Sequence, residues 1–372
     1  MIRVGIITFS NYNTNYGSAL QAFALKTFLE QNGCLVTFID YREFHHTEIS
    51  GLQKNLKNIL RKIYYRLHRK QIRERTRSFE LFREQNFLFT PLKTSTEELK
   101  QQKEIFDLYI CGSDQIWNFS CLGGIRTPYF LDFVPDHAIK ISYAASCGDH
   151  IFTGSELKLL GSLLQKMDKI SLREPEMIKK ISEISQKDVE LTVDPVFLLS
   201  KAEWENMLPP VKESVPENYA VCSFIRRAPE NRKLTDAVRK KLKLPILNLS
   251  DNAINPFGTY SGYHNSDPLQ FLSLVRNAKL LIGNSYHLAA FAIIFRKPFL
   301  VLQTEHNQKR LGHLLDCVGC STCILKDGVP EELCREQIFS PFFREEPLQT
   351  YLLHSKEFLL DALKKTEIVR KK

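Results

Sequence analysis

The sequence predicts an α/β protein built of two Rossmann-like, doubly wound domains that face each other across a cleft. Short apolar runs typical of buried strands alternate with amphipathic stretches typical of helices along most of the chain. This alternation pauses at the proline-rich, polar segment LPPVKESVP, residues 208–216, and then starts again, which places a domain boundary there. A chain of 372 residues is long enough for two domains of ordinary size.

The composition is that of a soluble globular protein, with 43% hydrophobic and 25% charged residues. No apolar run approaches the roughly 18 residues that span a bilayer, and the opening MIRVGIITF enters a strand without a signal-peptide pattern. The nine scattered cysteines fit buried thiols in a reducing compartment. We therefore expect a cytoplasmic protein, free or peripheral at the inner membrane. The net charge of +9 indicates a polyanionic partner, an anionic membrane surface or an anionic substrate.

The first predicted domain, residues 1–207, begins with a βαβ unit. A strand at residues 3–9 leads into an Asn-rich turn and a helix that ends near Gly33, and a second strand covers residues 34–40. Asn15 and Gly17 thus lie beside a helix N-terminus, where backbone N–H groups can bind a polar ligand, although an ordinary turn fits the same residues. Neither GxGxxG nor GxxxxGKS/T occurs, so this is not a dinucleotide or Walker site.

Residues 52–89 are predicted to form a long and strongly basic helical segment. Its cations are Lys54, Lys57, Arg61, Lys62, Arg66, Arg69, Lys70, Arg73, Arg75, Arg77 and Arg83, against the acids Glu74, Glu80 and Glu84. A solvated helical face explains this pattern, and so does a surface that docks on anionic lipid or on a phosphate-bearing acceptor. Nucleic acid is not expected as a partner, because the aromatic residues here do not form a stacking platform.

The rest of the first domain places polar residues after predicted strands. The strand at residues 105–111 ends in GSDQIWN, in which Asp114 and Asn118 flank the aromatic Trp117. This combination suits sugar hydroxyls, with Asp114 as acceptor or base, and a capping aspartate beside a core tryptophan is the alternative. Strands are also expected at residues 138–145, 169–172 and 189–193, and the second of these delivers Arg173 at its end.

The second predicted domain, residues 217–345, repeats the alternation. Strands are expected at residues 219–225, 246–249, 280–282 and 299–302, and helices at residues 229–242, 268–277 and 286–295. The last segment, residues 346–372, contains a long helix near residues 347–369 that is predicted to pack back over one of the domains.

The stretch LLIGNSYHLAAFAIIFRKPFLVL, residues 280–302, is the βαβ unit around which the second domain is organised. Asn284 and Ser285 break the strand and offer N-caps, and the helix that follows is apolar on every face and therefore buried. His287 lies in its first turn, at the carboxyl end of a strand, where open parallel sheets bind their ligands. Histidine suits proton transfer near neutral pH, and a hydrogen-bonded core histidine is the alternative.

Several of these segments together resemble the polysaccharide pyruvyl transferase family. They are NYGSALQAFAL near the amino terminus, GSDQIWN at 112–118, ISYAASCG at 141–148, SLRE at 171–174, VDPVFLL at 193–199 and GNSYHLAAFAIIFRKPF at 283–299. The resemblance implies a GT-B-like fold and a bacterial enzyme without a cofactor. It also implies that the enolpyruvyl group of phosphoenolpyruvate is transferred to a sugar, forming a cyclic ketal on a surface polysaccharide (a capsule or an exopolysaccharide) or on its lipid-linked precursor.

For this reaction the resemblance implies roles for residues at the predicted strand ends. His287 is the expected general acid, and Asp114, Asn118 and Asn15 are expected to face the acceptor. The phosphate and carboxylate of the donor need paired cations. Candidates for them are Arg173, Arg226, Lys297 and Arg310, and Gly17, Asn284 and Ser285 complete the predicted binding set.

Two features depart from the family pattern. Many family members carry arginine two residues before the histidine, where this chain has Ser285, so either other cations hold the donor or the substrate differs. Four cysteines also gather late in the chain, at Cys317, Cys320, Cys323 and Cys334. They could bind zinc or an iron–sulfur cluster, but reduced loop thiols without a metal are the preferred interpretation.

Two other functions fit the same sequence. A GT-B glycosyltransferase would use a nucleotide sugar and place His287 near its phosphates. A membrane-associated assembly factor of polysaccharide synthesis would instead use residues 52–89 as its working surface and would not need the histidine. Stabilisation by phosphoenolpyruvate would favour the pyruvyl transferase, and stabilisation by UDP or CMP sugars would favour the glycosyltransferase.

Overall fold

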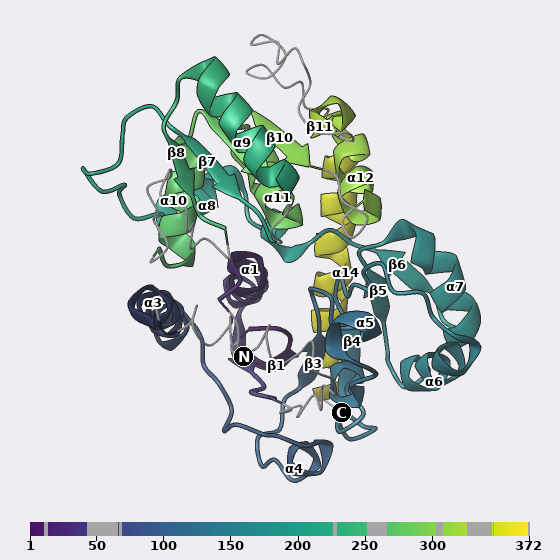
Figure 1. The fold of residues 1–372 in the computed structure, drawn as a ribbon. Coiled ribbons are helices and arrows are strands. Elements are labelled where there is room, and N and C mark those ends of the chain that lie inside the picture. The colour runs from purple at the N-terminus through teal and green to yellow at the C-terminus, as the bar shows by residue number, and fades with distance from the viewer. Residues whose placement is uncertain are drawn as a thin grey trace.

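The computed structural model describes residues 1–10, 14–42, 66, 69–225, 229–250, 266–302, 308–325, 344 and 346–370. Within these residues the chain forms two α/β lobes, each with a parallel sheet of its own (Figure 1). A long C-terminal helix, drawn in yellow, runs alongside both lobes. The predicted class, two Rossmann-like domains, is therefore confirmed.

The first lobe is built on a parallel sheet whose strands are largely buried. Its order is β2 (Cys34–Phe38), β1 (Ile2–Ile7), β3 (Leu108–Cys111) and β4 (Ile139–Ser142). The parallel pair β5 (Ile170–Leu172) and β6 (Val189–Leu191) continues this sheet through bridges from Ile141 to Lys169 and from Ala145 to Leu172. Strands covered on both faces are continuous apolar runs, which explains why they can be recognised in the sequence.

Helices cover this sheet, and several of them begin at side chains that cap the backbone. They are α1 (Tyr16–Gln31), α3 (Arg69–Asn86), α4 (Thr96–Lys100), α5 (Phe119–Leu122), α6 (Gly154–Leu164) and α7 (Pro175–Ser185), with the 3₁₀ turn η1 (Thr127–Phe130). The side chain of Asn15 accepts a hydrogen bond from the backbone N–H of Ser18 and so fixes the start of α1.

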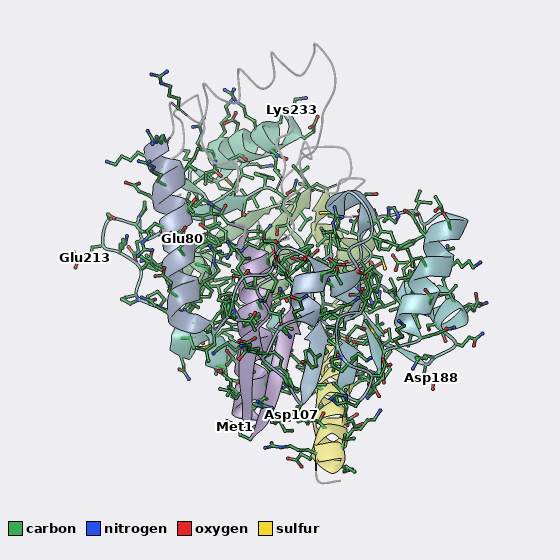
Figure 2. All side chains as sticks on the ribbon, turned by 90° about the horizontal axis from the view of Figure 1, so that it is seen from below. Met1, Glu80, Asp107, Asp188, Glu213 and Lys233 are labelled. Carbon is green, nitrogen blue, oxygen red and sulfur yellow. The ribbon has the colours of Figure 1, made fainter. Side chains whose placement is uncertain are left out.

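The basic segment differs from its prediction in two respects. The helix α3 ends at Asn86, and the chain beyond it leaves the helix to pack Phe87 and Phe89 against Phe38. Arg75 does not face solvent, because its Nη2 donates to the carbonyl of Thr14 over 2.8 Å. Figure 2 shows α3, marked by Glu80, along one flank of the molecule. Residues 52–65 and 67–68 of the predicted segment lie outside the described residues.

The second lobe carries a five-stranded parallel sheet. Its order is β11 (Ile324–Leu325), β10 (Phe299–Leu302), β9 (Leu280–Gly283), β7 (Ala220–Ser223) and β8 (Ile246–Asn248), and its helices are α9 (Pro229–Leu242), α10 (Pro268–Asn277), α11 (Tyr286–Ile294) and α12 (Gln308–Cys317). The strands β9 and β10 pair in parallel on either side of α11 in the sequence, so the predicted βαβ unit is confirmed. The helix α12 and the edge strand β11 were not predicted.

The two lobes share one continuous apolar core. The chain leaves β6 through the 3₁₀ turn η2 (Pro195–Leu198) and α8 (Lys201–Met207), and residues 208–216 then lead to β7 without helix or strand. The turn η2 packs against α1, α11 and the C-terminal helix α14 (Glu346–Arg370), so it joins core residues of both lobes. The ring of Tyr16 in α1 also stacks on Phe271 in α10, with 4.1 Å between the ring centres.

The C-terminal helix α14 (Glu346–Arg370) returns the chain to the first lobe. Its Lys365 Nζ lies 2.8 Å from a carboxylate oxygen of Asp168. Arg370 donates to the carbonyl of Met1, and Figure 2 shows this end of α14 beside Met1 and Asp107. In the part of the chain that the structure describes, no helix is both long and apolar enough to cross a membrane.

Candidate active site

The two sheets bring the carboxyl ends of their strands toward each other, and each has its topological switch point there. In the first sheet β1 lies between β2 and β3, and in the second β7 lies between β8 and β9. The turns that follow such strands leave a crevice in which open α/β sheets bind ligands. The two crevices meet, because α1, which follows β1, packs against α11, which follows β9.

Asp114 is the residue that the turn after β3 contributes to this junction. It adopts a left-handed conformation with φ 69°, and its Oδ2 accepts a hydrogen bond of 2.6 Å from the hydroxyl of Ser18 in α1. Its Oδ1 accepts a hydrogen bond from the backbone N–H of Gln115. Aspartate tolerates the left-handed region better than most residues, so the turn can aim the carboxylate at α1.

Arg173 follows β5 and is buried between two carboxylates. Its Nη1 donates to Oδ2 of Asp194, and its Nη2 lies 4.0 Å from Oδ1 of Asp114. Burial opposes the charge of this guanidinium and is the largest single effect, but Asp194 and the other neighbouring groups together outweigh it. The pKa of Arg173 therefore lies above its ordinary value. Among the described residues its Nε and Nη2 have no hydrogen-bond partner, and the guanidinium lies 4.9 Å from the ring centre of Tyr286.

Asp194 is the N-cap of η2, three residues past the end of β6, and its side chain is fully buried. Burial alone would raise the pKa of this carboxyl. The charge of His287, followed by that of Arg173, reverses the effect and lowers the pKa to about 2. Asp194 is therefore ionised at neutral pH, and its carboxylate links a cation of the first lobe to the histidine of the second.

His287 lies in the first turn of α11, which is capped by the hydroxyl of Ser285. Its Nε2 is 3.3 Å from Oδ2 of Asp194, which is an ion-pair distance and not an aligned hydrogen bond, because Nε2 has no hydrogen-bond partner among the described residues. Only 13% of the His287 side chain is exposed. The opposite edge of the ring packs on Gly17 in α1, where a methyl group would lie only 2.0 Å from Nδ1. Many enzymes place a buried carboxylate beside the imidazole that transfers a proton.

The contact between Gly17 and His287 makes a testable prediction. Gly17→Ala is expected to lower the free energy of unfolding by about 1 to 3 kcal/mol and to displace the imidazole, because the added methyl overlaps the ring. The matched control is Gly154→Ala, also in the first turn of a helix, where nothing lies within 4 Å of the added methyl. Urea unfolding of both variants measures the difference, and equal stability of the two would contradict the close packing.

Three of the predicted binding residues are occupied by local hydrogen bonds. Asn15 caps α1, Asn118 caps α5 and also donates from Nδ2 to Gln115 Oε1, and Asn284 accepts from the backbone N–H of Ile225. Asn15 and Asn284 flank the junction of α1 and α11, whereas Asn118 turns toward the loop of Gly148. Their roles in binding stay predictions.

The structure does not bring Lys297 to the junction. Lys297 directly precedes β10 and therefore lies at the amino edge of the second sheet, whereas His287 follows β9 at the carboxyl edge. Burial lowers the pKa of Lys297, and the neighbouring cations Arg276 and Lys279 lower it further. This correction follows from topology alone, because parallel strands start at one edge of a sheet and end at the other.

The remaining predicted residues are placed only in part. Arg226 and Cys334 lie outside the described residues, and Arg310 lies in α12 with its side chain outside them. Cys317 ends α12, Cys320 is the N-cap of the 3₁₀ turn η3 (Ser321–Cys323), and Cys323 is the last residue of that turn. Among the described residues no three His, Cys, Asp or Glu side chains are grouped so as to hold a metal.

The residues that meet at the junction form a cluster: Gly17, Ser18, Asp114, Arg173, Asp194, Tyr286 and His287. Three of them, Ser18, Asp194 and Tyr286, had no predicted role. Asp194 carried a signal, since an Asp-Pro pair directly after a predicted strand lies at the same sheet edge as Arg173. An Asp before Pro is also a common turn, so the pattern alone did not distinguish the two. Tyr286 lies between Ser285 and His287 and looks like one more apolar residue of a buried helix.

Comparison with solved structures identifies the fold. The chain is similar to a putative UDP-N-acetylglucosamine 2-epimerase from Listeria monocytogenes, with TM-score 0.55, 12% identity, and coverage of 98% of this chain and 96% of that one. The UDP-N-acetylglucosamine 2-epimerase from Rickettsia bellii gives 0.53 at 11% identity, covering 100% and 99%. The enzyme from Methanocaldococcus jannaschii, in complex with UDP-GlcNAc and UDP, gives 0.53 at 12% identity, covering 98% and 100%. Such low identity establishes a GT-B-like fold only.

Comparison of sequences identifies the family. No curated protein matches the chain significantly. The family model described as polysaccharide pyruvyl transferase matches residues 15–306, a range that covers most of both lobes and every residue of the cluster from Gly17 to His287. The chain therefore belongs to the polysaccharide pyruvyl transferase family, and it is a transferase.

Proposed function

We propose that the protein transfers the enolpyruvyl group of phosphoenolpyruvate to two hydroxyls of a sugar, forming a cyclic pyruvate ketal. The acceptor is a bacterial surface polysaccharide or its lipid-linked precursor. The observation that supports this most is the pair of His287 and Asp194 at the meeting point of the two crevices, within the range of the family match. The pair places an imidazole beside a buried carboxylate where the crevices of the two sheets meet.

In this proposal His287 is the general acid. Its proton adds to the methylene carbon of phosphoenolpyruvate, and the electron pair of the C=C bond forms the new C–H bond. The resulting oxocarbenium carbon is attacked by one sugar hydroxyl, phosphate leaves, and the second hydroxyl closes the ketal. Because Nε2 faces the Asp194 carboxylate at 3.3 Å, we assign the transferred proton to Nδ1, the ring nitrogen next to Gly17. Asp194 balances the charge of the ring without taking part in bond making.

The donor carries a phosphate and a carboxylate, and Arg173 offers two buried N–H groups without a partner among the described residues. Arg173 already faces two carboxylates, Asp194 and Asp114, so it cannot neutralise the donor alone. Further cations are required, and Arg226 and Arg310 remain our candidates for them. Ser285 cannot replace the arginine that many family members carry there.

Asp114 is proposed to face the acceptor. A sugar hydroxyl must lose its proton as it attacks, and a carboxylate within hydrogen-bond reach can accept it. Asp114 lies in the same cluster as Arg173, and Ser18 holds it in place from α1. The acceptor would therefore bind on the side of the first lobe, with Asn15 and Asn118 as the predicted additional contacts.

A membrane contact through α3 is part of the proposal. Arg69, Lys70 and Arg73 are exposed on this helix, and the side chain of Lys70 is 87% exposed. Each such cation near an anionic leaflet contributes about 1 kcal/mol. Peripheral attachment at the inner membrane would place the junction near a lipid-linked acceptor, while the enzyme itself needs no bound cofactor.

The rival function is that of a GT-B glycosyltransferase with a nucleotide sugar, which is favoured by the similarity to an epimerase solved with UDP. Incubation with phosphoenolpyruvate and candidate galactosides is expected to release phosphate and to add the mass of pyruvate less water to the sugar. Phosphoenolpyruvate is also expected to raise the melting temperature. Stabilisation by UDP or CMP sugars alone, without phosphate release from phosphoenolpyruvate, would favour the rival.

A further inference from the structure

A second hollow, of about 480 Å³, lies between η2, the end of α11 and α14. Phe197 and Leu348 line it, and they also line the small cavity that Arg173 and Tyr286 border. The hollow therefore lies next to this small cavity, and Phe197 and Leu348 stand between the two. Its volume falls in the range of sites that hold small organic ligands.

The floor of this hollow is apolar. The buried side chains of Phe197, Leu199, Ile293 and Val318 contribute to it from three separate segments of the chain. Leu348 and Leu352 extend it along α14 and are only partly buried. A floor of this kind gains free energy when it takes a hydrocarbon chain out of water, at about 0.8 kcal/mol for each buried CH₂ group.

The rim of the hollow is cationic. It is formed by Lys201, Arg296, Arg344 and Lys356, and none of its described lining residues is acidic. Lys201 Nζ has a carboxylate oxygen of Glu205 only at 4.0 Å, with 47% of the lysine side chain exposed, and such a pair is weak. The four cations come from α8, the turn after α11, α14 and the chain at residue 344, and all of them line the same hollow.

Arg296 adds an independent observation. It follows the end of α11 in a left-handed conformation with φ 54°, a position that glycine usually takes because other side chains are strained there. In this chain the position carries an arginine at the edge of the hollow instead. The backbone is therefore strained at this position, and the residue there is a cation.

We propose that this hollow is a second binding site for a phosphorylated amphiphile, taken up as a single molecule. Its phosphate would lie among the rim cations and its hydrocarbon chain on the apolar floor. The site goes beyond pyruvyl transfer and does not depend on it. Phe197 belongs to the turn η2, whose N-cap is Asp194. A ligand in the hollow would therefore contact the turn that places Asp194 beside His287.

Calorimetric titration of the full chain with octyl phosphate, kept below its micelle concentration, tests the proposal. Octyl phosphate is expected to bind at least tenfold more tightly than inorganic phosphate and than octyl glucoside, since each of these lacks one half of the ligand. The double variant Arg296→Glu/Lys356→Glu is expected to bind octyl phosphate at least tenfold more weakly. Lys201→Glu is a second rim variant, should the double variant not fold.

The matched control is Arg232→Glu/Lys233→Glu, two exposed cations on α9 in the second lobe, away from the hollow. This control is expected to keep the affinity of the unchanged protein. Equal affinity for octyl phosphate and inorganic phosphate, or full affinity in a folded rim variant, would overturn the proposal. Neither result would bear on pyruvyl transfer, because the titration contains no phosphoenolpyruvate and no sugar.

Discussion

His287→Gln is expected to lower kcat for pyruvyl transfer by about 10²- to 10⁴-fold, the contribution of a positioned general acid. Glutamine removes the transferable proton, and the buried carboxylate of Asp194 keeps its hydrogen bond from Arg173. The melting temperature should therefore change little. Phosphate release from phosphoenolpyruvate in the presence of acceptor measures the effect.

His150→Gln is the matched control for this variant. His150 Nε2 also lies 3.3 Å from a carboxylate, that of Glu156, and its side chain is 11% exposed, close to the 13% of His287. It lies in the first lobe, outside the cluster, so its replacement should leave kcat unchanged. A His287→Gln enzyme of full activity, combined with loss of activity on charge reversal at Arg66, Arg69 and Lys70, would favour the non-enzymatic assembly factor.

Asp194→Asn is expected to have a large effect on both activity and stability. The amide cannot neutralise Arg173, so a buried guanidinium loses its closest counter-charge, which typically costs about 3 to 5 kcal/mol. The imidazole also loses the carboxylate that orients it, so kcat should fall by about 10²-fold or more even where the variant is fully folded. Unfolding in urea and turnover at low temperature measure the two effects separately.

The pH dependence of stability shows whether Asp194 is an ionised, charge-paired carboxylate or an ordinary polar group. The pKa of Asp194 falls from 3.8 in the unfolded chain to about 2 in the folded protein, so its stabilisation is fully present above pH 4. It is lost as the pH falls from about 4 to about 2, and it amounts to about 2 kcal/mol at 1.36 kcal/mol for each pKa unit. The unchanged protein should therefore lose more stability than Asp194→Asn over this interval. Parallel pH profiles of the two would contradict the ionised, charge-paired carboxylate.

The fold could be predicted in most of its elements because its strands and central helix are buried on both sides. The unit from β9 to β10 has nearly the predicted limits, since apolar residues cover every face of α11 and Pro298 separates it from the next strand. The end of the basic helix could not be predicted in the same way. Phe87 and Phe89 leave it to pack on Phe38, a contact between residues far apart in the chain.

The grouping of these residues was predictable from their places after strands, and their roles stay predictions. Arg173 directly follows β5, Asp114 lies in the turn after β3, and His287 lies in the first helical turn after β9. The structure brings the three to one junction. Lys297 was predicted to bind the donor because of its charge. It precedes β10 and therefore lies at the edge of the sheet opposite His287. Asp194 was assigned no role, since its contact with His287 exists only once η2 packs beneath α11. Contacts between lobes of this kind have no periodic signal in the sequence.

The central claim is that the protein protonates phosphoenolpyruvate at the junction of its two lobes. Running the reaction in D₂O and examining the sugar product by mass spectrometry and proton NMR tests it most directly. The account predicts one solvent-derived deuterium in the methyl group of each ketal, formed at a rate that His287→Gln lowers by at least 10²-fold. A product without a pyruvyl methyl group, or deuterium incorporation at an unchanged rate in His287→Gln, would contradict it.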